Sequence, residues 1–198
     1  EGHKEGADAP LADAQRAIWT LRANAEKGHI NPQRIGIMGF SAGGHVAASL
    51  GTRFAQSVYP AMDAIDSVSA RPDFMVLMYP VISMQADIAH AGSRKQLIGE
   101  QPTEAQVARY SPEKQVTAQT PPTFLVHAVD DPSVSVDNSL VMFSALRGEK
   151  IPVEMHLFEK GKHGFGLRGT KGLPAAAWPQ LLDNWLQALP VEQPKAVP

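Results

Sequence analysis

The sequence predicts an α/β fold in which a mostly parallel β-sheet carries helices on both of its faces. Three apolar segments of strand length, at 34–38, 74–79 and 123–129, show no alternation of polar and apolar residues. Strands of this kind are buried on both faces, as in a parallel sheet that helices cover. Helical segments separate them, an order typical of α/β proteins. A fourth predicted strand at 153–158 alternates more, so we expect it nearer an edge of the sheet.

The composition fits one domain over residues 1–198 and excludes several classes of function. The chain is 43% hydrophobic, which suffices for one core. Lys and Arg number 18 against 20 Asp and Glu, so no basic surface for nucleic acid is indicated. No apolar stretch approaches the roughly 18 residues of a membrane span. The chain has no cysteine, which removes disulfides and thiolate metal sites but does not fix the compartment.

A helix is predicted near the amino terminus. Asp8 suits an N-cap position, and Pro10 suits a first helical turn. Gly28 can end the helix. Between these two limits, apolar residues recur on one helical face: Leu11, Ala14, Ile18, Leu21 and Ala25.

Later helices are predicted at 136–148 and 175–189. The stretch 82–120 is long, polar and poorly periodic, apart from a short helix at 103–109. We interpret this stretch as an insertion over the carboxyl edge of the sheet, where a lid or a substrate wall would lie. A surface loop without function would explain the polar, poorly periodic sequence of this stretch equally well.

Ser41 lies at the centre of the most informative motif, a G-x-S-x-G pentapeptide at 39–43. It directly follows the predicted strand at 34–38, and a helix rich in small residues is predicted at 42–51. A serine on a tight turn between strand and helix presents its hydroxyl to a substrate. The flanking glycines are expected because the turn is strained and the helix packs close to the strand. The N–H of Ala42 is then the expected first donor of an oxyanion hole.

A serine hydroxyl needs a base to accept its proton and a carboxylate to orient that base. The carboxylate is expected after the strand at 123–129, where Asp130 and Asp131 stand together. We choose Asp131 because it lies further into the loop and Pro132 stiffens the turn beyond it. Asp130 would then support the site without contacting the base itself. The alternative is that both carboxylates only solvate a turn or cap the next helix.

The base is expected after the fourth predicted strand, where His163 stands beside Gly164. Other histidines fit less well. His127 lies within a predicted buried strand, where it would pack or hydrogen-bond locally, and His45 lies one helical turn beyond Ser41. His127 and the nearby aspartates do not complete a ligand set, so we expect neither a metal nor another cofactor.

With these residues placed, the chain resembles the α/β-hydrolase superfamily, and more narrowly bacterial acetyl xylan esterase-like and hormone-sensitive-lipase-like esterases. The resemblance spans about residues 8–190 and rests on short segments at 34–45, 110–113, 120–124, 130–131, 138–139 and 162–165. It implies hydrolysis of short-chain acyl esters, including acetyl groups on plant polysaccharides, by Ser41, His163 and Asp131. The expected partner is a small-molecule or polysaccharide ester. The alternatives are a serine peptidase of the prolyl oligopeptidase type and a non-catalytic relative that binds a ligand or partner.

The sequence departs from this family before Ser41. Family members carry several strands and a Gly-rich oxyanion loop ahead of the nucleophile, whereas only 40 residues precede Ser41 here. We therefore expect this sequence to be the carboxyl-terminal part of a longer enzyme. The strand at 34–38 would then lie at the sheet edge, and we expect an absent segment, another chain or residues 1–10 to cover it. Left uncovered, this edge should make the isolated piece prone to aggregate.

Overall fold

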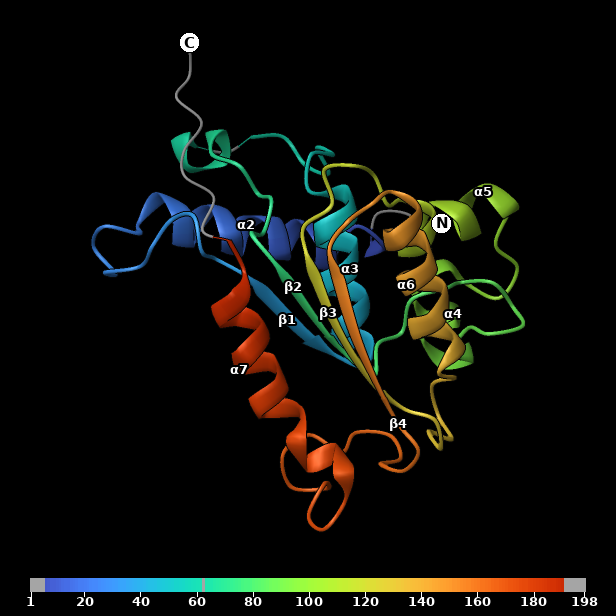
Figure 1. Ribbon diagram of the computed structural model, residues 1–198. Helices are drawn as coiled ribbons and strands as arrows, with labels where there is room; N and C mark the ends of the chain where they lie inside the picture. The colour runs from blue at the N-terminus through green and yellow to red at the C-terminus, as the bar shows by residue number, and fades with distance from the viewer. Residues whose placement is uncertain (1–5, 62, 191–198) are drawn as a thin grey trace.

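A four-stranded sheet forms the centre of the computed structural model, which describes residues 6–61 and 63–190 (Figure 1). All three strand pairings are parallel. The strands stand in chain order across the sheet: β1 (Ile37–Phe40), β2 (Met75–Met78), β3 (Thr123–Ala128) and β4 (Val153–Phe158). The predicted α/β class with a parallel sheet is therefore confirmed.

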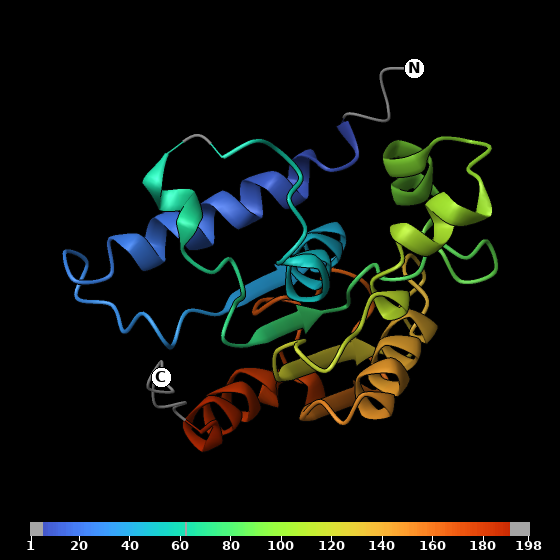
Figure 2. The same cartoon turned by 90° about the horizontal axis from the view of Figure 1, so that it is seen from above.

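Helices cover both faces of this sheet (Figure 2). One face carries α2 (Ala9–Ala23), α3 (Ala42–Arg53) and α6 (Asp137–Gly148), and the other carries α7 (Trp178–Ala188). The segment between β2 and β3 forms α4 (Ala91–Ile98), α5 (Glu104–Arg109) and the 3₁₀ turn η2 (Pro112–Lys114). Two further 3₁₀ turns are η1 (Ala64–Ser67) and η3 (Pro174–Ala177).

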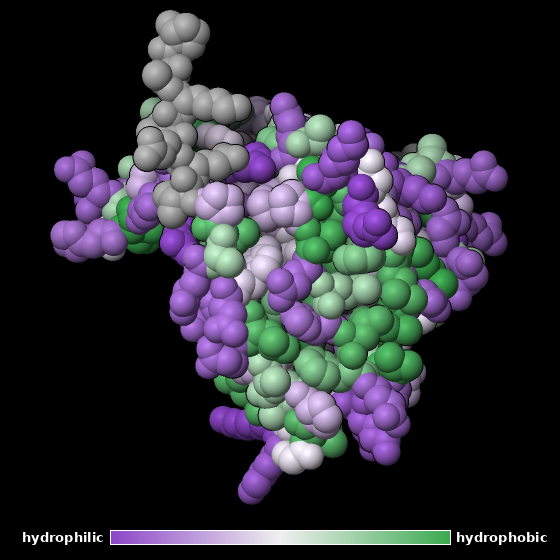
Figure 3. Space-filling model, in the orientation of Figure 1, coloured by the Kyte–Doolittle hydropathy of each residue, from purple (hydrophilic) through white to green (hydrophobic). Residues whose placement is uncertain are grey.

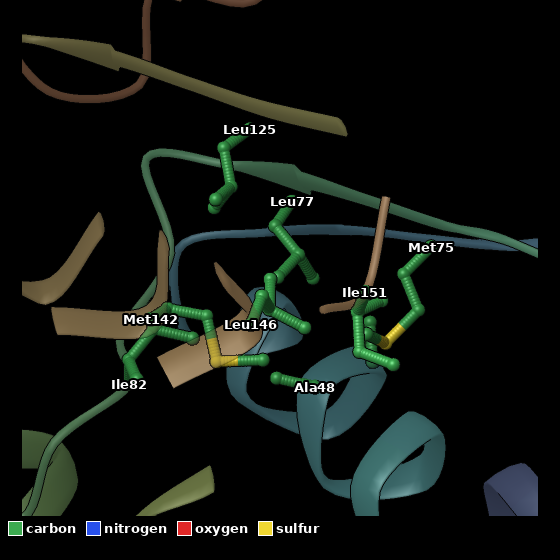
Figure 4. Close-up of a cluster of buried hydrophobic side chains, with 9 residues drawn as sticks. Ala48, Met75, Leu77, Ile82, Leu125, Met142, Leu146 and Ile151 are labelled. Carbon is green, nitrogen blue, oxygen red and sulfur yellow. The ribbon is translucent and has the colours of Figure 1, made fainter. Parts of the chain in front are cut away.

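The two faces of β2 explain why its sequence does not alternate. Met75 and Leu77 are fully buried in a cluster between the sheet, α3 and α6 (Figure 4). Val76 and Met78 point the other way, into a cluster that includes Trp178 and Trp185. Both faces are thus shielded from water, and every residue of the strand is apolar for that reason.

Two predicted boundaries near the amino terminus are wrong. The first helix ends at Ala23 instead of Gly28, because residues 24–30 form successive turns, and Leu21 is 44% exposed. The first strand begins at Ile37 instead of residue 34. The N–H of Ile35 donates to the Asp73 carboxylate instead of to a backbone carbonyl, while its carbonyl accepts the N–H of Asp73.

The other elements lie within a few residues of the predicted positions, and the helix α4 was not predicted. Its residues give no clear apolar face, since Ile98 alone among them is buried. No helix in the described part of the chain is long and apolar enough to cross a membrane.

The sheet has an edge on each side. Within the part of the chain that the structure describes, β4 pairs only with β3, as its alternation predicts. Hydrophobic side chains gather over β4 and α6 on the face shown in Figure 3. At the other edge β1 pairs only with β2 among the described residues, and its Met38 and Phe40 are each 40% exposed. What covers this edge stays a prediction.

Candidate active site

Ser41 occupies a strained turn between β1 and α3. Its φ is 54°, a region that residues with a side chain rarely adopt. Backbone groups at and just after the end of β2 hold Ser41 there. The Ser41 N–H donates to the Met78 carbonyl at 3.0 Å, and the Ser41 carbonyl accepts the N–H of Val81 at 3.0 Å. The strain is therefore stabilised by backbone hydrogen bonds on both sides of the serine.

The glycines of the pentapeptide differ in purpose. A Cβ at Gly39 would lie 2.1 Å from the Gly43 carbonyl oxygen, because the first turn of α3 passes directly over the strand. A Cβ at Gly43 would meet nothing within 4 Å. The prediction that close packing requires a glycine is right for Gly39 and wrong for Gly43. Gly44 is a further tight position, since its Cβ would lie 2.6 Å from Pro80.

The structure brings Ser41, His163 and Asp131 together at the carboxyl ends of β1, β4 and β3. Ser41 Oγ lies 2.8 Å from His163 Nε2, and His163 Nδ1 lies 2.7 Å from Asp131 Oδ2. An ionised carboxylate can only accept, so Nδ1 carries the hydrogen and Nε2 is free to accept the serine proton. The Asp131 side chain is fully buried, whereas that of His163 is 23% exposed.

The loop around Asp131 favours its ionised form. Its Oδ1 accepts the backbone N–H groups of Ser133 and Val134 at 2.8 and 2.9 Å. Burial acts to raise the pKa of Asp131, but hydrogen bonds from Val134, His163 and Ser133 outweigh it and hold this pKa below its ordinary value. The carboxyl is therefore ionised at neutral pH.

Asp130 lies on the neighbouring loop surface and has a separate contact. Its Oδ1 accepts the backbone N–H groups of Gly161 and Lys162, each at 2.8 Å. These residues directly precede His163, so Asp130 ties the carboxylate loop to the histidine loop. Beyond His163 the chain turns sharply, with Gly164 at φ 72°.

Tyr79 is a site residue that the sequence analysis did not identify. Its ring packs edge-on against His163, with centroids 5.2 Å apart, and against Phe165 at 4.7 Å. It has a φ of 37° and is buried, which raises the pKa of its phenol. The sequence offered no signal for it, because Tyr79 simply ends an apolar strand.

Two other histidines have buried partners of their own. His45 Nε2 lies 2.8 Å from the carbonyl oxygen of Tyr110, so it fastens α3 to the segment after α5. His127 is fully buried in β3, as predicted, and hydrogen-bonds to Ser139 and Val134. Within the described residues, no group of three or more acidic or histidine side chains could hold a metal ion.

A cleft of about 610 Å³ opens beside the first residue of α3, Ala42. The N–H of Ala42 has no acceptor within the helix, because the first four N–H groups of a helix lack such partners. The segment 82–120 supplies part of the cleft wall through Met84, Leu97 and Tyr110. This segment therefore borders a cleft that reaches Ala42, whereas Ser41 and His163 are not among the residues that line it.

Residues 3–146 match the BD-FAE family. An acetylxylan esterase of Xylanibacter ruminicola is 32% identical over 192 residues, which are 95% of this chain and 37% of that protein. An endo-1,4-beta-xylanase B of Butyrivibrio fibrisolvens is 41% identical over 155 residues, which are 78% of this chain and 24% of that protein. The chain thus spans much less than half the length of either curated relative.

Among solved structures, an acetyl ester-xyloside bifunctional hydrolase of Caldicellulosiruptor lactoaceticus superposes with a TM-score of 0.84 and 46% identity. The match covers 90% of this chain and 65% of that one.

Proposed function

We propose that the chain, which belongs to the BD-FAE family and has the α/β-hydrolase fold, acts as a serine esterase. One observation carries this proposal. The side chains of Ser41, His163 and Asp131 form a continuous chain of hydrogen bonds, with the serine on a strained turn. This arrangement is what nucleophilic acyl transfer by a serine requires.

The proposed reaction starts when Ser41 Oγ attacks the ester carbonyl carbon and His163 Nε2 accepts the hydroxyl proton. Asp131 holds the imidazole and stabilises its positive charge. When the tetrahedral intermediate collapses, the bond to the alcohol oxygen breaks and His163 donates the proton to that oxygen. Water then attacks the acyl carbon and gives a proton to His163. The bond from that carbon to Ser41 Oγ breaks, His163 returns the proton to Oγ, and the free acid leaves.

The negative oxygen of the intermediate needs donors already in place. The N–H of Ala42 stands at the amino-terminal end of α3, next to the nucleophile. Removal of one such donor typically lowers the rate about 10²- to 10³-fold. We therefore propose Ala42 as the first donor and assign no second one.

The proposed substrates are short-chain acyl esters, with acetyl groups on xylan as the first candidates. The acetylxylan esterase and acetyl ester-xyloside hydrolase relatives favour this choice. The cleft beside Ala42 is the proposed place for the remainder of the substrate, with the segment 82–120 as one part of its wall.

The test uses Ser41→Ala in the intact protein, with p-nitrophenyl acetate and acetylated xylan as substrates and a fluorophosphonate as a covalent label. We expect turnover to fall by about 10⁶-fold, the loss typical of removing the nucleophile from such a triad. Labelling should disappear as well. Ser133→Ala is the matched control, because Ser133 contributes only its backbone N–H to Asp131.

Retained labelling in Ser41→Ala, together with an unchanged rate, would refute the serine mechanism. A wild-type protein that cleaves prolyl peptide amides but no acetyl ester would instead indicate a peptidase.

A further inference from the structure

His127 is a polar side chain in the most buried strand of the sheet. All six residues of β3 are buried, and His127 itself has no exposed surface. A buried imidazole without partners costs free energy, so each ring nitrogen should have a hydrogen bond. The partners of these two nitrogens show what the residue does.

The partners determine the tautomer of His127. Nε2 lies 3.0 Å from the Val134 carbonyl oxygen, which can only accept, so Nε2 carries the hydrogen. Nδ1 lies 2.7 Å from Ser139 Oγ and accepts the hydroxyl hydrogen of that serine. Burial lowers the pKa of His127, which agrees with a neutral ring.

The same Nε2 lies 3.3 Å from Asp131 Oδ2, and both side chains are fully buried. Asp131 Oδ2 is the oxygen that contacts His163 Nδ1 at 2.7 Å. Asp131 Oδ2 therefore accepts the Nδ1–H of His163 and lies within 3.3 Å of the ring nitrogen of His127 that donates to Val134, and the other oxygen accepts the N–H groups of Ser133 and Val134. Three hydrogen bonds and this close contact leave the carboxylate little freedom to rotate.

His127 also shapes the loop that carries the carboxylate. Val134 accepts from His127 through its carbonyl and donates to Asp131 through its N–H. The loop after β3 thus folds back onto the end of that strand, and the His127 imidazole bridges the strand and Val134 in the loop. Ser139, on the first turns of α6, keeps the ring oriented.

We propose that His127 is a positioning residue: its Nε2–H, shared between the Val134 carbonyl at 3.0 Å and Asp131 Oδ2 at 3.3 Å, holds Oδ2 in the orientation that accepts the Nδ1–H of His163. This inference rests on the proposed function, since it concerns the same hydrogen-bond chain. His127 touches no reacting atom. Its effect reaches Ser41 only through Asp131 and His163.

The first test uses the natural protein with ¹⁵N-labelled histidine. We expect NMR to show His127 neutral, with its hydrogen on Nε2. In Asp131→Asn the Nε2–H signal of His127 should move, because its acceptor loses a negative charge. A hydrogen on Nδ1 alone, or a signal that Asp131→Asn leaves unchanged, would overturn the proposal without any variant of His127.

The second test compares two variants of His127. The amide of His127→Gln reaches the place of Nε2 and can still donate to Asp131, whereas that of His127→Asn reaches only the place of Nδ1. We expect His127→Asn to lower kcat by about 10²-fold, the effect of a small misplacement in a catalytic group. KM should not change, because a fully buried residue meets no substrate. His127→Gln should restore most of kcat, and thermal unfolding of both variants checks the fold.

A folded His127→Asn with the kcat of the wild type would overturn the proposal. So would a folded His127→Gln as impaired as His127→Asn, because the glutamine amide reaches the place of Nε2 and the asparagine amide does not. The proposed function fails separately, if Ser41→Ala and His163→Ala keep wild-type activity. Loss of activity in those two variants beside a normal His127→Asn would reject only the positioning role.

Discussion

At the scale of single residues, two adjacent aspartates have different tasks. Asp131 is fully buried and faces His163, whereas Asp130 lies on the surface and accepts two backbone N–H groups. Both are aspartates and they are adjacent in the chain, so the sequence hardly distinguishes them. The direction of each side chain, which the loop decides, separates them.

Exchange of each carboxylate for its amide tests this difference. Asp131→Asn should lower kcat by about 10⁴-fold, because an amide can donate to the histidine and so stabilise the wrong tautomer. Asp130→Asn should change kcat little, because its Oδ1 can still accept from Gly161 and Lys162. Steady-state kinetics on p-nitrophenyl acetate measures both. Equal losses in the two variants would contradict the assignment of Asp131.

At the scale of elements, the turn from β1 to α3 depends on one close approach. The Gly43 carbonyl passes over Gly39 with no room for a Cβ, and the next glycine is pressed against Pro80. This contact sets the angle at which the helix leaves the strand, and therefore where Ser41 points.

Two alanine substitutions separate close packing from the motif as such. Gly39→Ala should lower the free energy of unfolding by about 3 kcal/mol, because the new Cβ overlaps backbone that cannot move away easily. Gly43→Ala should be neutral or stabilising by up to about 1 kcal/mol, because it replaces glycine within a helix where space is open. Urea unfolding of both variants gives the comparison. A Gly43→Ala variant as unstable as Gly39→Ala would contradict the statement that a Cβ at position 43 has room.

The segment after β2 is held by side chains from other elements. Asn138 Oδ1 on α6 accepts the N–H groups of Ile82 and Ser83, at 2.9 and 3.0 Å. Ser111 Oγ accepts the N–H of Met84 at 2.9 Å. These contacts give a structural reason for two segments of the resemblance, 110–113 and 138–139. They anchor the start of the cleft wall to the body of the domain.

At the scale of the whole molecule, Asp8 joins three helices that are distant in sequence. It stands at the N-cap position of α2, as predicted, but its side chain makes no capping hydrogen bond. It pairs instead with Arg53 at the end of α3 and with Arg109 at the end of α5, at 2.9 and 2.8 Å. The Arg53 side chain is only 2% exposed, so its charge depends on this partner.

Asp8→Asn should therefore destabilise the protein by up to about 3 kcal/mol at pH 7, the lower end for breaking a buried ion pair. Burial acts to raise the pKa of Asp8, but Arg53 and Arg109 outweigh it and lower this pKa. The contribution is then fully present above the unfolded pKa of about 3.9, and it is lost as pH falls through the lower folded value. Urea unfolding at pH 7 and near pH 3 should show the wild type and the variant converging in acid.

Asp13→Asn, an exposed change on the same helix, is the control and should shift stability by no more than about 0.5 kcal/mol. A gap between wild type and Asp8→Asn that stays constant with pH would contradict the ion-pair explanation.

Much of the fold and the candidate site could be predicted from the sequence because both follow local rules. Apolar runs such as residues 123–129 become buried strands, and residues that follow parallel strands meet at one edge of the sheet. The G-x-S-x-G pentapeptide indicates Ser41, and the order of the strands then indicates the loops that carry Asp131 and His163. Helix α4 and the end of α2 could not be found, since their limits depend on turns and contacts rather than on an apolar face.

The sequence by itself determined the parallel α/β arrangement and the three residue types that could form a catalytic chain, because these depend on strand burial and chain order. The tertiary structure alone decided the contacts that hold the chain in place. Tyr79 packs on His163, and Asp130 ties two loops together. His127 lies 3.3 Å from the Asp131 oxygen that accepts from His163. Such contacts depend on distances of a few ångströms between residues far apart in the sequence, and no local pattern of residues encodes those distances.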